Sequence, residues 1–269
     1  MIKLIALDLD GTVLGPDMKP VECARQAIRR ALSNGVRVVL ATGRSFWSGA
    51  AHASDLGLAP GPLIAYNGAL VREFPDGPDL RELPVPLDDA RVVIELCRTN
   101  GIYLQIYQDD RCYASMDCEW VTRHTRITGR VPSGIGDLAS FLKKAPPKLC
   151  VMGDARELEL ASRLVREALG DRLSVTRSLP FVVEFLHPQA SKGKALEFVA
   201  AALGIRREEV MACGDSANDL DMIEWAGVGV AMGSAGEEVK AVADWVAPGG
   251  CGEGVASAIE RFVLNEHEG

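Results

Sequence analysis

The chain has 269 residues, which is enough for one large α/β domain or for two smaller domains with separate cores. Hydrophobic residues make up 48% and charged residues 25%, a balance that excludes an intrinsically disordered chain. The 37 acidic residues outnumber the 29 lysines and arginines, and the formal charge of −8 argues against nucleic acid as a partner.

The cysteines and the apolar runs indicate in which cellular compartment the protein is expected. Seven cysteines are spread along the chain without a C-x-x-C spacing, which predicts reduced thiols and neither a zinc site nor a disulfide framework. Acidic residues interrupt the apolar N-terminus before it reaches signal-peptide length, and no apolar run of about 18 residues occurs. We therefore expect a cytoplasmic protein with no membrane partner, and we make no prediction of its oligomeric state.

Elements of an alternating α/β fold fill the first part of the chain. Apolar runs predict strands at residues 3–9, 36–41 and 63–66, and apolar positions at helical spacing predict a helix over 20–33. A second helix is expected after Arg44. Strands that alternate with helices favour a parallel sheet with right-handed crossovers.

The pattern changes near residue 82. A helix is predicted from Asp88, acting as its N-cap, to Asn100. Strand-like runs then follow one another, with two helices between them: strands at 102–108, 111–115, 147–152 and 181–186, and helices near 137–143 and 155–169. Such a mixture predicts a separate α+β module at residues 82–187.

Strict alternation returns after residue 187. A helix from Ser191, a strand at 209–213, a helix from about Asn218, a strand at 228–232 and two more helices are expected in that order. We therefore predict one Rossmann-like domain, formed by residues 1–81 and 188–269, which is interrupted by a second domain at residues 82–187.

Two aspartates end the first predicted strand, where open α/β sheets place their active sites. The two-residue step between Asp8 and Asp10 keeps both carboxylates on one side of an extended strand. Gly11 then allows a sharp turn, and Thr12 adds a hydroxyl beside the acids. Taken alone, the pair could equally belong to an ordinary turn.

Three later segments also follow apolar runs or open helices. Thr42-Gly43-Arg44 ends a strand and opens a helix, where a hydroxyl and backbone N–H groups can hold a phosphate. Ser191 fits an N-cap, which leaves Lys192 free to reach inward. The simpler interpretation of Thr42-Gly43-Arg44 is a common strand-to-helix turn, and that of Lys192 is a solvated side chain. Gly214-Asp215-Ser216-Ala217-Asn218-Asp219 groups two carboxylates on one strand-end loop, which favours a bound cation.

Together the segments DLDGT, TGR, SKG and GDSAND, in this order, resemble the four motifs of the haloacid dehalogenase (HAD) superfamily of phosphohydrolases. The stretches Tyr66-Asn67-Gly68-Ala69 and Ala231-Met232-Gly233-Ser234-Ala235 resemble its Cof-type branch, subclass IIB. The resemblance implies an α/β fold, with a Rossmann-like parallel-sheet core and an inserted α+β cap domain of the C2B type. The loop Pro248–Gly254 departs from the more acidic or polar loop that family members often show.

The resemblance also implies roles for individual residues. Asp8 would be the nucleophile that forms an aspartyl-phosphate, and Asp10 the general acid and base. Lys192 would bridge Asp8 and the phosphate. The implied phosphate-binding residues are Thr42, Gly43, Arg44, Lys192 and Asn218. For Arg44 two alternatives stay open, contact with the substrate or only a place in the lining of the cleft.

A cation is expected beside the nucleophile. A carboxylate that approaches a phosphate dianion meets a repulsion of roughly 4 kcal/mol per charge pair at about 4 Å. Mg²⁺ suits this place because it accepts hard oxygen ligands and keeps several waters. The resemblance implies that its ligands are the Asp8 carboxylate, the Asp10 backbone carbonyl and Asp215, while Asp219 acts through metal-bound water.

These inferences predict a magnesium-dependent phosphatase of small phosphorylated metabolites such as sugar phosphates. The inserted domain would close over the cleft and select the substrate. Two alternatives stay open: a phosphomutase of hexose phosphates, and a non-catalytic module that binds phosphorylated metabolites.

Four other patterns are interpreted as structural. Gly214-Asp215-Ser216 lacks a histidine placed by a motif, and Ser191-x-x-Lys194 lacks the companion motifs of acylating enzymes. The glycines around Cys251 lack dinucleotide-site spacing and predict a flexible loop. A small basic cluster predicts a solvated face, or a site for a second anionic group of the substrate: Arg123, His124, Arg126 and Arg130.

Overall fold

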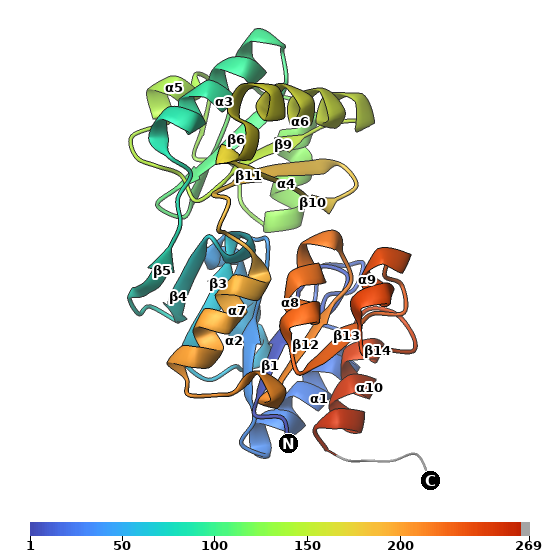
Figure 1. The fold of residues 1–269 in the computed structure, drawn as a ribbon. Helices are drawn as coiled ribbons and strands as arrows, with labels where there is room; N and C mark the ends of the chain where they lie inside the picture. The colour runs from blue at the N-terminus through green and yellow to red at the C-terminus, as the bar shows by residue number, and fades with distance from the viewer. Residues whose placement is uncertain (265–269) are drawn as a thin grey trace. The chain divides into compact units, whose positions relative to one another are not determined.

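The computed structural model describes residues 1–264, and the chain forms two compact units (Figure 1). The core unit consists of Met1–Arg81 and the chain from Ser191 onward, and the inserted unit is Glu82–Ala190. The predicted domains were 1–81, 82–187 and 188–269, so the second boundary differs, at residue 190 in place of 187. Residues 265–269 of the last predicted segment lie outside the described residues.

A five-stranded parallel sheet, in the order β14-β13-β12-β1-β2, organises the core unit. Its strands are β1 (Leu4–Leu7), β2 (Arg37–Leu40), β12 (Val210–Gly214), β13 (Val228–Ala231) and β14 (Trp245–Val246). The strand β1 has the sequence LIAL, is buried throughout and pairs with β12 on one side and β2 on the other. A central parallel strand is covered on both faces, which explains its continuous apolar run.

Six helices flank this sheet: α1 (Glu22–Ser33), α2 (Phe46–Leu56), α7 (Lys192–Ala202), α8 (Leu220–Trp225), α9 (Glu237–Val242) and α10 (Glu253–Phe262). Helix α1 packs against α10, and α7 packs against α8 (Figure 1). The alternate β1 residues Leu4 and Ala6 share a buried cluster with Val199 of α7 and Met222 of α8. Residues two apart point to the same face of a strand, so α7 and α8 cover that face.

A small three-stranded sheet extends the core unit: β3 (Gly61–Ala65), β4 (Leu70–Phe74) and β5 (Asp79–Glu82). The run at 63–66 was predicted as a strand of the parallel sheet, but it pairs antiparallel with β4 and touches β2 only through the bridge Ala41–Ile64. The turn η1 (Tyr66–Gly68) separates β3 from β4, and Tyr66 and Asn67 both take positive φ there.

The inserted unit is built on a six-stranded sheet in the order β10-β11-β9-β6-β7-β8. The strands are β6 (Leu104–Gln108), β7 (Arg111–Ala114), β8 (Gly134–Ile135), β9 (Leu149–Met152), β10 (Ser174–Leu179) and β11 (Val182–Leu186). The helices are α3 (Leu87–Thr99), α4 (Glu119–Thr128), α5 (Leu138–Phe141) and α6 (Ala155–Leu169). Residues such as Ile106 and Phe185 form one buried cluster with α3 and α6.

Three predictions in this unit are wrong or incomplete. Pro86, and not Asp88, is the N-cap of α3; Asp88 lies in the first turn, where an acid is favourable beside the helix N-terminus. The helix α4 was not predicted, because its sequence EWVTRHTRIT is mostly polar. The strand β10 was missed because SVTRSL is polar and lies at the edge of the sheet, exposed to solvent on part of its surface.

The side of this sheet opposite α3 and α6 holds buried polar groups. Lys148 and Glu184 form an ion pair there, and the Lys148 ammonium lies 5.1 Å from the centre of the Tyr107 ring. His124 of α4 is 5% exposed, and burial, assisted by the charge of Lys148, lowers its pKa to about 4. His124 is therefore neutral near pH 7 and does not belong to an exposed basic cluster. Arg123 stacks over Phe181 at 3.6 Å.

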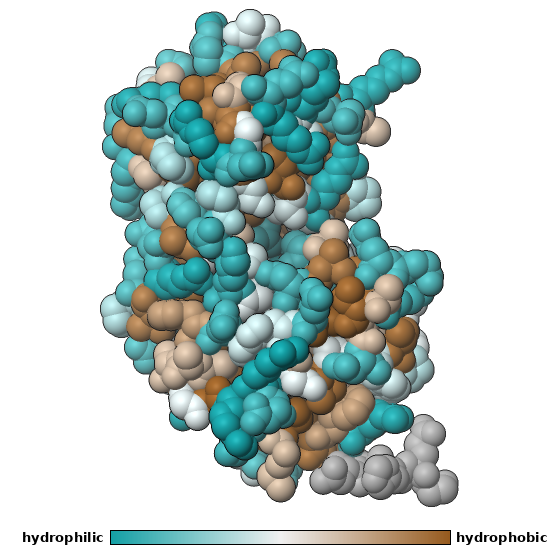
Figure 2. All heavy atoms as spheres, in the orientation of Figure 1, coloured by the Kyte–Doolittle hydropathy of each residue, from teal (hydrophilic) through white to brown (hydrophobic). Residues whose placement is uncertain are grey.

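The surface is mainly hydrophilic on the face that Figure 2 presents, with several smaller groups of hydrophobic residues between the hydrophilic ones. Among the described residues, no helix combines the length and apolar character needed to cross a bilayer.

We predict that His124→Gln makes stability less sensitive to acid. The folded His124 resists protonation until about pH 4, whereas the unfolded one binds a proton below 6.5, so it lowers the free energy of unfolding as pH falls through this window. The full effect, reached below about pH 4, is on the order of 3 kcal/mol, of which about 2 kcal/mol falls between about pH 7 and about pH 5. Urea unfolding of both proteins at about pH 7 and about pH 5 measures it. Equal losses in both proteins would contradict the assignment.

Candidate active site

The carboxyl end of β1 carries the first group of polar side chains. Asp8 follows the strand directly, is 4% exposed, and is fixed by a hydrogen bond from its N–H to the Cys213 carbonyl. The chain then turns at Gly11, whose φ of +84° suits glycine. A side chain at Gly11 would also meet the carboxylate of Asp215, so the turn brings the loops after β1 and β12 into contact.

Lys192 joins this group from the first turn of α7. Ser191 is the N-cap predicted for the helix, and its Oγ accepts from the Lys194 N–H. The Lys192 ammonium is fully buried and lies 2.6 Å from Asp8 Oδ1 and 2.6 Å from Asp219 Oδ1. Burial lowers the pKa of Lys192, but the carboxylates of Asp219 and Asp8 outweigh that effect and raise it. Lys192 is therefore a permanent cation between two acids.

The loop after β12 supplies two carboxylates with different surroundings. Asp219 Oδ2 accepts from the backbone N–H groups of Asp215 and Ser216, each at 3.0 Å, so this side chain holds the loop and Lys192 together. Asp215 accepts from the hydroxyls of Thr12 and Ser216 at 3.1 and 3.0 Å. Hydroxyl donors leave the Asp215 oxygens with lone pairs that can bind a cation.

Three carboxylates converge closely enough to share a metal ion. One oxygen each from Asp8, Asp215 and Asp219 lies within 4.8 Å of the others, and carboxylate oxygens suit a hard divalent cation. Burial, with repulsion from Asp219, raises the pKa of Asp215 to about 6. Burial likewise raises the pKa of Asp8, against the attraction of Lys192. Three ionised acids and one lysine carry a net charge of −2, which a divalent cation would neutralise. The residues therefore fit such an ion.

The segment Thr42-Gly43-Arg44 meets the turn η1 beside this group. Thr42 is fully buried, its carbonyl accepts from the Asn67 N–H, and its hydroxyl accepts from the Arg44 N–H. A side chain at Gly43 would lie 2.9 Å from Asn67 Oδ1, so glycine is needed for close packing there. Asn218 donates to Asn67 Oδ1 at 2.9 Å, while its own Oδ1 is buried without a hydrogen bond in the described residues.

Arg44 forms an ion pair with Asp10. Its Nε and Nη2 donate to the two carboxylate oxygens of Asp10 at 2.8 and 2.6 Å, a bidentate pair with Arg44 almost buried. Its Nη1 donates to Ser48 Oγ at 3.2 Å and lies 3.2 Å from His52 Nε2. A phosphate contact by Arg44, like those of Thr42, Gly43 and Asn218, stays a prediction.

The predicted site residues therefore lie together at one edge of the core sheet. Sequence reasoning gave no site role to three partners: Asn67, which it named only within a Cof-type stretch, and Ser48 and His52, which contact Arg44. The spacing of four residues between Ser48 and His52 predicts that they share one face of a helix, but only the fold shows that this face meets Arg44.

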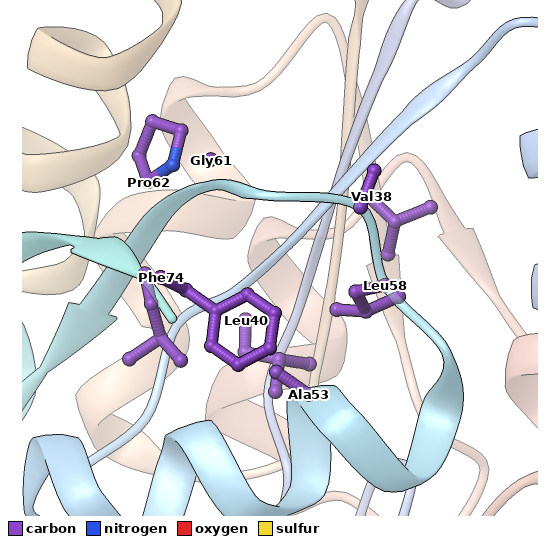
Figure 3. A pocket seen from close by; sticks show the side chains of 9 residues that line it. Val38, Leu40, Ala53, Leu58, Gly61, Pro62 and Phe74 are labelled. Atoms are coloured by element: carbon purple, nitrogen blue, oxygen red, sulfur yellow. The ribbon is translucent and has the colours of Figure 1, made fainter. Parts of the chain in front are cut away.

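A separate small cavity lies between β2, β3 and the end of α2 (Figure 3). It encloses about 10 Å³ and is lined by apolar groups such as Leu40, Ala53 and Phe74. It has room for about one water molecule and offers no groups for phosphoryl chemistry.

Similarity to known proteins identifies the family. The family model of haloacid dehalogenase-like hydrolases matches residues 5–259. The chain belongs to the haloacid dehalogenase-like hydrolase family. The predicted superfamily is thus confirmed.

Several relatives of this HAD hydrolase are named as phosphatases. It is 34% identical over 268 residues to the protein named "Putative phosphatase YxeH" of Bacillus subtilis (strain 168), covering 98% of this chain and 99% of that one. It is 32% identical over 265 residues to the 5-amino-6-(5-phospho-D-ribitylamino)uracil phosphatase YcsE of the same organism, covering 98% and 96%. The HAD protein is accordingly an enzyme of the phosphatase type.

Its fold is that of subclass IIB, as predicted. The solved structure of the HAD subclass IIB sugar phosphatase BT4131 superposes with a TM-score of 0.84 at 22% identity, covering 97% of this chain and 98% of that one. The shared fold is a Rossmann-like parallel-sheet core with an inserted α+β domain.

We predict that Gly68→Ala destabilises the protein more than Gly35→Ala. Both glycines have positive φ, +87° and +78°, but a side chain at Gly68 would lie 2.2 Å from the Ser191 carbonyl, whereas Gly35 has open space around it. The Gly35 change should cost about 1 kcal/mol of backbone strain, and the Gly68 change at least about 2 kcal/mol more. Urea unfolding measures the loss of unfolding free energy in both variants. Equal losses would show that the close approach of Gly68 to the Ser191 carbonyl does not limit the side chain at residue 68.

Proposed function

We propose that the protein is a magnesium-dependent phosphomonoesterase that transfers the phosphoryl group to Asp8 and then to water. The observation that carries the proposal is the position of Asp8. Its carboxylate ends the central strand, contacts a fully buried lysine and lies within reach of two further carboxylates. A nucleophile for a phosphate dianion needs positive charge beside it, because like charges otherwise keep the reactants apart; Lys192 and a cation held by the carboxylates would supply that charge.

In the first step, an Asp8 oxygen attacks phosphorus and the bond to the leaving oxygen breaks. Lys192 holds Asp8 in place through Oδ1 at 2.6 Å, which fixes the direction of attack. Its position between Asp8 and Asp219 also lets its charge offset the negative charge of the transferring group. The product of this step is an aspartyl-phosphate and an alcohol.

Asp10 moves the protons of both steps in this proposal. When protonated, it gives a proton to the leaving oxygen, and as a carboxylate it then takes one from the water that attacks the aspartyl-phosphate. Its side chain is 25% exposed, so substrate and water can reach it. Release of inorganic phosphate restores Asp8.

Magnesium would be held by Asp8, Asp215 and the Asp10 backbone carbonyl, with Asp219 acting through bound water. When bound, it supplies positive charge to the phosphate oxygens and to the Asp8 carboxylate. Asp219 has both oxygens engaged by Lys192 and the loop N–H groups, which supports an indirect role.

Small phosphorylated metabolites are the proposed substrates, with sugar phosphates foremost. The relative YcsE is named for a substrate whose phosphate ends a ribityl chain, and a phosphorylated polyol resembles a sugar phosphate chemically.

We predict that Asp8→Asn abolishes magnesium-dependent phosphate release. An amide is a poor nucleophile, so the rate should fall by at least about 10³-fold. Release of phosphate from p-nitrophenyl phosphate and from a hexose phosphate panel measures the loss. Free phosphate as the product, in place of an isomeric hexose phosphate, also separates a phosphatase from a mutase. Full activity of the variant would refute the nucleophile.

We predict that Asp215→Asn weakens magnesium dependence without removing the nucleophile. One fewer carboxylate lowers the attraction for the cation, so the half-saturating Mg²⁺ concentration should rise at least about tenfold. Activity should partly return at high Mg²⁺, in contrast to Asp8→Asn. An unchanged magnesium titration would place the metal elsewhere.

A further inference from the structure

A row of side chains connects helix α2 with the Asp10 carboxylate. Arg44 donates to both Asp10 oxygens, and the far side of its guanidinium meets Ser48 and His52. Ser48 and His52 are four residues apart on one face of α2, and Arg44 lies just before Ser45, the N-cap of that helix.

The main chain around Arg44 is fixed independently of these contacts. Its N–H donates to Thr42 Oγ1, and its carbonyl accepts from the Tyr66 N–H at 2.9 Å. Ser45 is the N-cap of α2, with Oγ accepting from the Ser48 N–H. The start of α2 is therefore anchored, and the contacts of Ser48 and His52 act on the end of the Arg44 side chain.

The contact with Arg44 determines the form of the His52 ring. A guanidinium has only donors, so His52 Nε2 accepts and the ring is neutral with its proton on Nδ1. Burial and the charge of Arg44 lower the pKa of His52, against smaller opposing effects of Asp10 and Asp55. Ser48 is 3% exposed and offers its hydroxyl oxygen to the same Nη1.

We propose that Ser48 and His52 are positioning residues that orient Arg44 and, through it, the Asp10 carboxylate toward the leaving oxygen. This proposal rests on the proposed acid and base role of Asp10. Two parallel hydrogen bonds hold a carboxylate in one plane, so a guanidinium that tilts also tilts the acid. Misplacement of a proton donor by about 1 Å can cost up to about 10²-fold in rate.

The leaving group gives a readout that a merely structural role would not move. An alkyl alkoxide needs a proton from Asp10 as it departs, whereas p-nitrophenolate is stable enough to leave without one. Loss of Asp10 orientation should therefore slow alkyl phosphates selectively. General loss of structure should slow both substrates alike.

Three variants test the proposal in the full chain. His52→Ala should lower kcat for glycerol phosphate about tenfold while changing kcat for p-nitrophenyl phosphate less than about twofold. His52→Gln should restore both rates, because its amide oxygen can accept from Arg44 in place of Nε2. Ser54→Ala, an exposed change on the same helix, is the matched control and should leave both rates unchanged. Equal losses with both substrates, or failure of Gln to rescue, would overturn the proposal.

A second measurement separates this proposal from the proposed function. In ¹⁵N-labelled protein, the Arg44 Nε–H signal should shift or broaden in His52→Ala and return in His52→Gln. An unchanged signal in His52→Ala would overturn the positioning role, whatever the activity. A wild-type chain that releases no phosphate would instead refute the proposed function, while the Arg44 signal would still decide the positioning role.

Discussion

The buried ammonium of Lys192 is the group on which the site depends. Removing a lysine from water costs several kcal/mol, and here two carboxylates at 2.6 Å offset that cost. The three partners come from different elements: Asp8 from the end of β1, Asp219 from the loop after β12, and Lys192 from the start of α7. The ion pairs thus tie together segments that lie far apart in the chain, and α7 begins where the chain returns to the core unit.

Such close convergence is possible because glycines stand where the segments meet. A side chain at Gly214 would lie 2.5 Å from Asp219, and one at Gly193 would lie 2.6 Å from the Asp221 carbonyl. With Gly11, Gly43 and Gly68, they let backbone and acidic side chains approach closely. The glycines of these motifs are therefore explained by packing between loops, without any contact to a phosphate.

The sequence was sufficient for the parts that rest on strong local patterns. Neighbouring residues alone were enough to predict three features: the strand β1, the N-cap at Ser191 and the acids at the strand ends. The sequence was insufficient where contacts between distant segments determine the structure. The polar helix α4 is stabilised by burial of His124, and the separation of β3 from the parallel sheet depends on pairing with β4. Ser48 and His52 carry no motif, so only the fold shows that they meet Arg44.

The charges divide the site into two groups with different needs. Asp10 and Arg44 form an ion pair whose charges balance each other without a metal. Asp8, Asp215 and Asp219 exceed the single charge of Lys192, and burial makes that excess costly. The uncompensated negative charge would therefore attract a divalent cation to Asp8 and Asp215. The Asp10 side chain would attract it less, because Arg44 already balances its charge. In the proposed mechanism, this separation would keep the Asp10 side chain off the metal while the Asp8 carboxylate lies beside it.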